Sequence, residues 1–196
     1  MLYVVIFLLY FLAGSFTYGQ SCKNLPSKWT ANNVFVKAFE KNQTIEGVLI
    51  YDATNNFTLL KGDISEDGKY LGFVKQYTDY TTRVMHIEMA KYNICKEVTF
   101  DEMFMPDINL KQSGKRLLST SLMADTSTEA ETWQSQYEVN DIQLEMVMTV
   151  LKSGNMCLPT YAVVHSSIVT SITVFGNITI GIPSGPHEKC KNITPD

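Results

Sequence analysis

The sequence predicts an all-β protein with a minor helical content. Three observations support this fold class: apolar and polar residues alternate with a period of two in many segments, turn-forming residues separate these segments, and helical periodicity is weak. About nine to eleven antiparallel strands in one domain imply two packed sheets or a curved, partly closed barrel. Either arrangement can fill its interior with side chains or leave a cavity.

The clearest strand candidate spans residues 142–150. Five apolar residues of this segment share one face: Ile142, Leu144, Met146, Met148 and Val150. Further strands are expected at residues 34–40, 47–52, 57–61, 70–77, 82–89, 92–98, 133–139 and 167–180. Turns rich in Gly, Asn, Asp and Ser separate several of them. A short helix is expected at residues 101–105, and a polar loop at 124–132.

The first segment is typical of a signal peptide. Residues 2–12 form an unbroken apolar run, whereas a helix needs roughly 20 residues to cross a bilayer. Thr17 and Gly19 are small enough for the positions before a cleavage site, so we expect a signal peptide at residues 1–19. No Lys or Arg precedes the run, and an uncleaved anchor is the alternative. Residues 20–196 are expected to form one soluble domain.

Charge and composition exclude some classes of protein. The chain of 196 residues has a net charge of −4 and no Lys/Arg-rich run, which argues against a nucleic-acid partner. A hydrophobic share of 45% with 11% aromatic residues argues against a disordered chain.

Glycosylation sequons agree with export from the cell. Four of them occur, at Asn42, Asn56, Asn177 and Asn192. We therefore expect an extracellular glycoprotein, with the lysosomal lumen as the alternative destination.

The cysteines also suit an oxidising compartment. Their number is even, and they are Cys22, Cys95, Cys157 and Cys190. No CxxC motif occurs, so a zinc ribbon or a thioredoxin-like site has little support. The sequence alone permits three disulfide connectivities.

Catalytic signatures are sparse. His86 and Glu88 share one face of an expected strand and could bind a metal or relay a proton, but a cross-strand polar patch is the favoured interpretation. His165 precedes two serines, yet no GxSxG motif accompanies it. We expect no enzymatic activity, and a hydrolase is the minor alternative.

Calcium is the one candidate cofactor. Ca²⁺ prefers six to eight oxygen ligands, often from clustered carboxylates. Two acidic clusters occur, one of Asp63, Glu66 and Asp67 and the other of Asp125, Glu129 and Glu131. Neither has the EF-hand pattern, and solvated loops are the favoured interpretation, so we assign no metal ligand.

The apolar faces suggest a pocket for a hydrophobic ligand. Methionine adapts to irregular shapes, and the chain contains nine. The candidate lining residues are Leu144, Met146, Met148 and Val150, with Ile50 and Phe73 as weaker candidates. An ordinary sandwich core is the alternative, which periodicity alone favours.

Several short landmarks follow one another in a defined order. They are Cys22-x-x-x-Pro26-x-x-Trp29, Tyr51-Asp52, Cys95-Lys96, Pro106-Asp107-Ile108, Trp133, Cys157-Leu158-Pro159 and the segment 175–182 before Cys190. Their order and spacing resemble the ependymin-related family along nearly the whole mature chain.

This resemblance implies two stacked, curved antiparallel sheets in a half-open, barrel-like fold similar to bacterial lipoprotein carriers. It further implies a deep hydrophobic pocket, a homodimer, and an association with calcium, lipids or gangliosides and cell–matrix adhesion. The family pairing would join Cys22 to Cys157 and Cys95 to Cys190. Many relatives have an additional cysteine pair, and many have a basic residue soon after Tyr51-Asp52. Neither feature occurs here, so neither is transferred.

The leading hypothesis is a secreted, non-enzymatic glycoprotein that binds a lipid, an acyl chain or a ganglioside between two sheets. The alternative is a calcium-responsive glycoprotein of the extracellular matrix that carries no lipid.

Overall fold

A computed structural model describes residues 25–99, 114–121, 128–139, 142–153, 156–167 and 170–181. These residues form strands β1 (Lys28–Ala38), β2 (Gln43–Asp52), β3 (Phe57–Glu66), β4 (Lys69–Asp79), β5 (Val84–Met89), β6 (Ile94–Thr99), β7 (Gly114–Ser121), β8 (Thr128–Val139), β9 (Ile142–Ser153), β10 (Met156–Ser166) and β11 (Thr170–Ile180). A 3₁₀ turn, η2 (Ala90–Tyr92), joins β5 to β6. The predicted signal peptide and the predicted helix at 101–105 lie outside the described residues.

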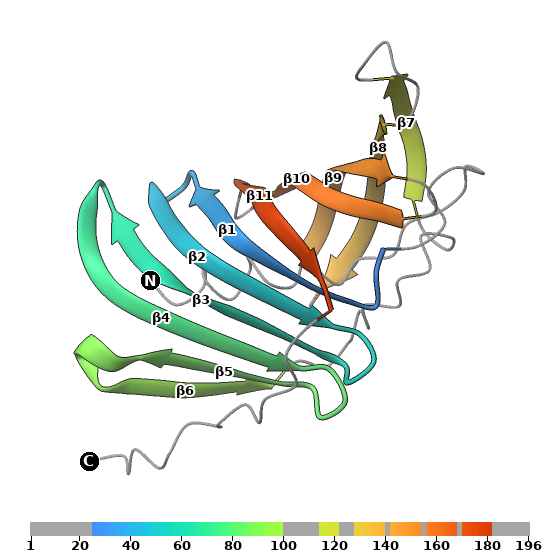
Figure 1. Cartoon of the computed structure of the whole chain (residues 1–196). Coiled ribbons are helices and arrows are strands. Elements are labelled where there is room, and N and C mark those ends of the chain that lie inside the picture. Colours follow the sequence, from blue (N-terminus) through green and yellow to red (C-terminus); the bar gives the residue numbers. More distant parts are fainter. Residues whose placement is uncertain are drawn as a thin grey trace.

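All eleven strands belong to one antiparallel sheet with the order β6-β5-β4-β3-β2-β1-β11-β10-β9-β8-β7. The half formed by β1–β6 is strongly curved, and the half formed by β7–β11 is turned at an angle to it (Figure 1). The two edge strands, β6 and β7, lie far apart, so the sheet does not close into a barrel. The prediction of an all-β, half-open fold is confirmed, with the two halves joined by the pairing of β1 with β11.

Within the described ranges, no helix has the length and apolar character needed to cross a membrane.

Alternation along β1 defines the two faces of the sheet. Trp29 and Ala31 are buried, and after a bulge Val34 and Val36 are buried on the same face. We call this face the core face and the opposite one, which carries the exposed Phe35, the outer face. The bulge inserts one extra residue and thereby keeps apolar side chains on the core face along the whole strand.

An aromatic cluster joins three strands at the centre of the sheet. Trp29 of β1 stacks on Tyr51 of β2 with ring centroids 5.3 Å apart. The same indole meets Phe175 of β11 edge-on at 5.8 Å. All three side chains are buried, and such aromatic pairs contribute energy beyond their buried area. Both halves of the sheet are therefore packed against one tryptophan.

Two opposed glycines allow β2 and β3 to approach each other closely. Gly47 of β2 is paired with Gly62 of β3. A Cβ atom on Gly47 would lie 1.9 Å from the carbonyl oxygen of Lys61 and 2.6 Å from the Cα of Gly62. Because both contacts are with backbone, no side-chain rotation can relieve them, so only glycine fits here.

The turn after β2 is held by a buried carboxylate. Asp52 accepts hydrogen bonds from the backbone N–H of Asn55 at 3.0 Å and from its side-chain amide at 2.8 Å. Lys28 of β1 forms an ion pair with Asp52 at 3.1 Å. Burial alone would raise the pKa of Asp52, but the hydrogen bonds from Asn55 and the charge of Lys28 outweigh it, so the pKa is lowered.

Several strands differ from the predicted ones, most clearly β1, β7, β8 and β10. β1 begins at Lys28, before the predicted start at Val34. Its bulge interrupts the alternation, so the sequence pattern did not reveal the residues that precede Val34. β8 begins at Thr128, inside the segment predicted as a polar loop. β7 and β10 were not predicted as strands: Pro159 interrupts the pattern of β10, and the register shifts just after it.

The first prediction concerns the close approach of β2 and β3. We expect Gly47→Ala to lower the free energy of unfolding by about 3 kcal/mol or more, because the backbone must move to accommodate the Cβ atom. Gly176→Ala is the matched control, because its Cβ would meet its nearest neighbours at 3.3 and 3.4 Å. Urea denaturation of both variants measures the difference, and equal stabilities would contradict the prediction.

The second prediction concerns Asp52. A carboxylate whose pKa is lowered by folding stabilises the protein above its unfolded pKa of about 3.9, and this contribution disappears as the pH falls through the folded pKa. We expect Asp52→Asn to destabilise the protein by about 2 kcal/mol at pH 7 and by less at pH 2. Denaturation at both pH values tests this, with the exposed Asp67→Asn as the control. An equal loss at both pH values would contradict it.

Candidate functional site

The core face of β9 carries the methionine-rich stretch predicted to line a pocket. Met146, Met148 and Val150 are all buried there. Met148 lies between Trp133 of β8 and Ala162 of β10 in the register of the sheet. Leu144 belongs to the same strand, where it pairs with residues of β8 and β10. The structure thus brings the stronger candidates of the sequence analysis onto one strand.

The other half of the sheet contributes to the same apolar face. Its buried residues include Met85, Ile87 and Met89 of β5, which belong to one hydrophobic cluster together with Met146 and Met148. The hydrophobic cluster of the core face therefore extends from β5 across the shared strand β1 to β8.

The two weaker candidates lie on the outer face. Ile50 stands between the buried core-face residues Leu49 and Tyr51, so its side chain points the opposite way. Phe73 precedes the buried Val74 and is 47% exposed. The alternation of each strand thus removes both residues from a pocket on the core face.

Polar side chains also occur on the core face, and sequence reasoning missed them. Gln76 and Thr78 of β4 are buried in line with Val74. Thr58 of β3 and Tyr80 are buried beside them, and their hydroxyls form a hydrogen bond of 3.2 Å. The alternation of residues 70–77 was the available signal, since it places Gln76 on the apolar side of its strand.

Glu131 and both tryptophans are also buried on this face, and the burial of Glu131 differs from its predicted environment. Glu131, expected in a solvated loop, is fully buried on β8 opposite Val150. Trp133, two residues further along β8, is also fully buried. The indole nitrogens of Trp133 and Trp29 both lack a hydrogen-bond partner.

His86 and His165 lie on the outer face, and His187 lies outside the described residues. His86 lies 3.7 Å from Glu97 on the neighbouring strand, while Glu88 forms an ion pair with Lys75 at 3.8 Å. This arrangement is the cross-strand polar patch that the sequence analysis favoured over a metal site or a proton relay. His165 is exposed, and its Nδ1 lies 2.9 Å from the hydroxyl of Thr170. It borders a surface hollow of about 360 Å³.

The acidic residues near the β3–β4 turn have separate partners. Asp63 accepts a hydrogen bond from the hydroxyl of Tyr70 at 3.4 Å, and Asp67 accepts one from the side chain of Asn42 at 2.9 Å. Glu66 accepts one from Gln43. Among the residues that the structure describes, no three potential metal ligands come together.

The second acidic cluster is only partly within the described ranges. Asp125 lies outside them, Glu129 lies in β8, and the burial of Glu131 separates its carboxylate from solvent. Calcium binding stays a prediction.

Asn42 and Asn56 fall at turns, and Asn177 lies within β11. Asn42 and Asn177 are exposed, Asn56 is half-buried, and all three have a positive φ, which asparagine tolerates better than most residues. Asn192 lies outside the described residues, and glycosylation stays a prediction.

Two of the four cysteines lie within the described residues. Cys95 of β6 and Cys157 of β10 are disulfide-bonded. Cys22 and Cys190 lie outside the described residues, so the predicted pairing of the four stays a prediction.

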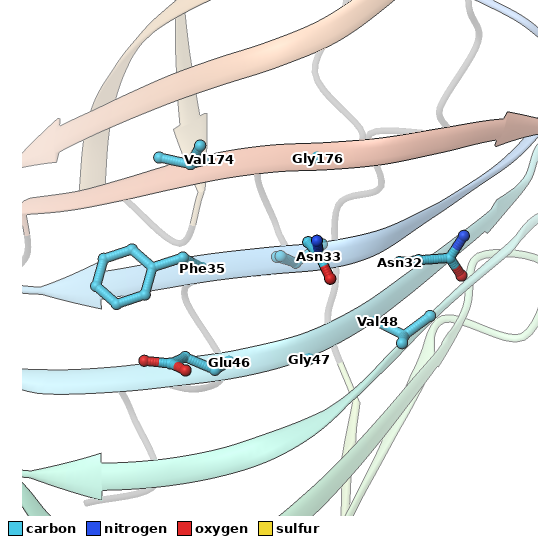
Figure 2. Close-up of a pocket in the computed structure, with 9 residues that line it drawn as sticks. Asn32, Asn33, Phe35, Glu46, Gly47, Val48, Val174 and Gly176 are labelled. Atoms are coloured by element: carbon cyan, nitrogen blue, oxygen red, sulfur yellow. The ribbon is translucent and has the colours of Figure 1, made fainter.

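A groove of about 520 Å³ crosses the outer face over β1, β2 and β11. Figure 2 shows Phe35 between Glu46 of β2 and Val174 of β11, near the bare backbone at Gly47 and Gly176. Gly176 has the same orientation along β11 as the exposed Val174, so its missing side chain leaves space on the outer face. Sequence reasoning did not identify it, because it depends on which strands are neighbours.

No protein-family model matches the chain, and no curated protein matches it in sequence. Among solved structures, LprF from Mycobacterium bovis is similar over 81% of this chain and 90% of its own, with 9% sequence identity and a TM-score of 0.41. At this identity and TM-score, neither a family nor a ligand is transferred to the chain.

The third prediction separates the two faces. Met148→Ala should lower the free energy of unfolding by about 2–4 kcal/mol, because it leaves a cavity on the core face. Phe73→Ala on the outer face should change it by about 0.5 kcal/mol or less. Chemical denaturation measures both, and similar losses would show that the faces are assigned wrongly.

Proposed function

We propose that the protein is a non-enzymatic carrier that binds an apolar ligand against the core face of its open sheet. The observation that carries this proposal is the single apolar face to which both halves of the sheet contribute. Among the described strands, β6 and β7 lie at opposite edges of the sheet and do not pair with each other, so closure does not fix the angle between its halves. A ligand lying between the halves would contact both at once.

The methionines support a ligand of flexible shape. Met85 and Met89 come from one half of the sheet, and Met146 and Met148 come from the other. A methionine side chain is unbranched and polarisable, so it can follow the outline of different acyl chains. A core built for packing alone is better served by residues with fewer rotamers.

Apolar burial can offset much of the free-energy cost of binding an acyl chain. An acyl chain of about twelve carbons would gain roughly 10 kcal/mol on complete burial, at about 0.8 kcal/mol per methylene group. This gain is comparable with the estimated cost of association of about 4–15 kcal/mol. A longer chain, or a ligand with additional polar contacts, would bind more tightly.

The wider biological setting is also proposed. The signal-like first segment and the sequons support a secreted or lysosomal glycoprotein. The order of the landmark residues supports a place in the ependymin-related family, and with it a homodimer. These inferences depend on the sequence and are independent of the core face.

The fourth prediction tests ligand binding. We expect native mass spectrometry of the protein, purified after export from eukaryotic cells, to show co-purifying lipid, and a fluorescent fatty acid to bind saturably. Met148→Phe should weaken the binding about tenfold by filling space on the core face. Phe73→Ala, on the outer face, is the control and should bind as the wild type does. Thermal denaturation checks that both variants fold.

If neither bound lipid nor saturable binding were found, the carrier proposal would fail. Binding that Phe73→Ala weakens and Met148→Phe leaves unchanged would place the ligand on the outer face instead.

A further inference from the structure

We propose that the ligand is an uncharged lipid with a hydroxyl group, and that Gln76 and Thr78 of β4 bind this hydroxyl. The inference rests on the proposed function and adds the chemical class of the ligand. It starts from two buried side chains whose hydrogen-bonding groups find no suitable partner in the protein.

Gln76 is fully buried, yet its amide is poorly satisfied. Its Nε2 donates to the thioether sulfur of Met85 at 2.9 Å, which is a weak acceptor. Its Oε1 is buried and has no hydrogen-bond partner. Exchanging the two ends of the amide would not help, because the oxygen would then face the sulfur and the N–H groups would have no acceptor. The side chain thus offers one vacant acceptor.

Thr78 lies two residues further along the same face and is 2% exposed. Its Oγ1 is also buried and without a partner. By contrast, the neighbouring Thr58 and Tyr80 satisfy one another through their hydroxyls. Gln76 and Thr78 thus present two vacant polar atoms on one face of β4, and their Cα atoms are about 7 Å apart in a strand of this kind.

Leaving such groups without partners is costly. A buried polar atom that loses its hydrogen bond costs free energy, and buried polar groups in native proteins are almost always paired. A bound molecule that pairs with both atoms would recover this loss. Both residues lie on the core face, so a ligand that pairs with these atoms would lie in the proposed site.

A hydroxyl group matches this pair of atoms. It can donate its hydrogen to Oε1 of Gln76 and accept one from the hydroxyl of Thr78. A carboxylate has no hydrogen to donate and would bring a negative charge to the partial negative charge of Oε1. Gln76 is flanked by Leu60 and Ile87, both buried, and such surroundings disfavour a charged group further. The geometry points to alcohols rather than fatty acids.

The experiment compares ligands with the same chain and different heads. Displacement of a fluorescent acyl probe by 1-dodecanol, dodecanoate and dodecane gives the relative affinities for the full mature protein. We expect dodecanol to bind at least about tenfold more tightly than dodecanoate. Gln76→Met and Thr78→Val should each remove most of this preference while retaining affinity for dodecane. Thr132→Val, which removes a hydroxyl paired with Thr149, is the matched control and should keep the preference.

Thermal denaturation without ligand gives a second measurement. Because the two polar atoms have no partner in the protein, Gln76→Met and Thr78→Val should leave Tm unchanged or raise it. A marked fall in Tm for both variants would show that these groups are satisfied within the protein and would overturn the inference.

The outcomes separate this inference from the proposed function. Equal binding of dodecanol and dodecanoate, or a preference that both variants retain, would overturn the hydroxyl-binding role and leave the carrier intact. Failure of all three ligands to displace the probe, with no saturable binding of the probe itself, would overturn both proposals.

Discussion

The structure depends on β1, which is hydrogen-bonded to β2 along one edge and to β11 along the other. This double pairing brings the first and last described strands together at the centre of the sheet. Without it the chain would form two separate antiparallel stacks, and each would have an apolar face open to water. Trp29 reinforces the pairing, since its ring contacts Tyr51 on one side and Phe175 on the other. One strand thus makes two apolar surfaces into a single core face.

A second constraint shapes the half formed by β1–β6. Gly47 and Gly62 let the backbones of β2 and β3 approach more closely than any residue with a Cβ atom would allow. The groove beside Phe35 lies on the outer face, and Gly47 and Gly176 are among the residues that line it. The core face is mostly apolar, whereas the outer face is open and bears the polar pairs of His86 and Lys75.

The sequence predicts the fold class well and the candidate site only in part. Alternation on β9 identified Met146, Met148 and Val150, because a regular strand has a period of two. Ile50 and Phe73 were chosen for their apolar character, and the alternation of their own strands places them on the outer face. β10 was missed because Pro159 is unusual within a strand, and here it adjoins a register shift. The pairing of β1 with β11 joins residues that are distant in sequence, so no local sequence pattern predicts it.

The core face as a ligand site can be tested through the only two tryptophans of the chain. Trp29 and Trp133 both lie on the core face, one in each half of the sheet, and both are buried. The most direct measurement is tryptophan fluorescence during titration with a brominated fatty alcohol, since bromine quenches an indole only at short range. The carrier account predicts saturable quenching of both tryptophans, which Trp29→Phe and Trp133→Phe resolve individually, and reversal by the unbrominated alcohol. Emission that the brominated ligand leaves unchanged, in protein that remains folded, would contradict it.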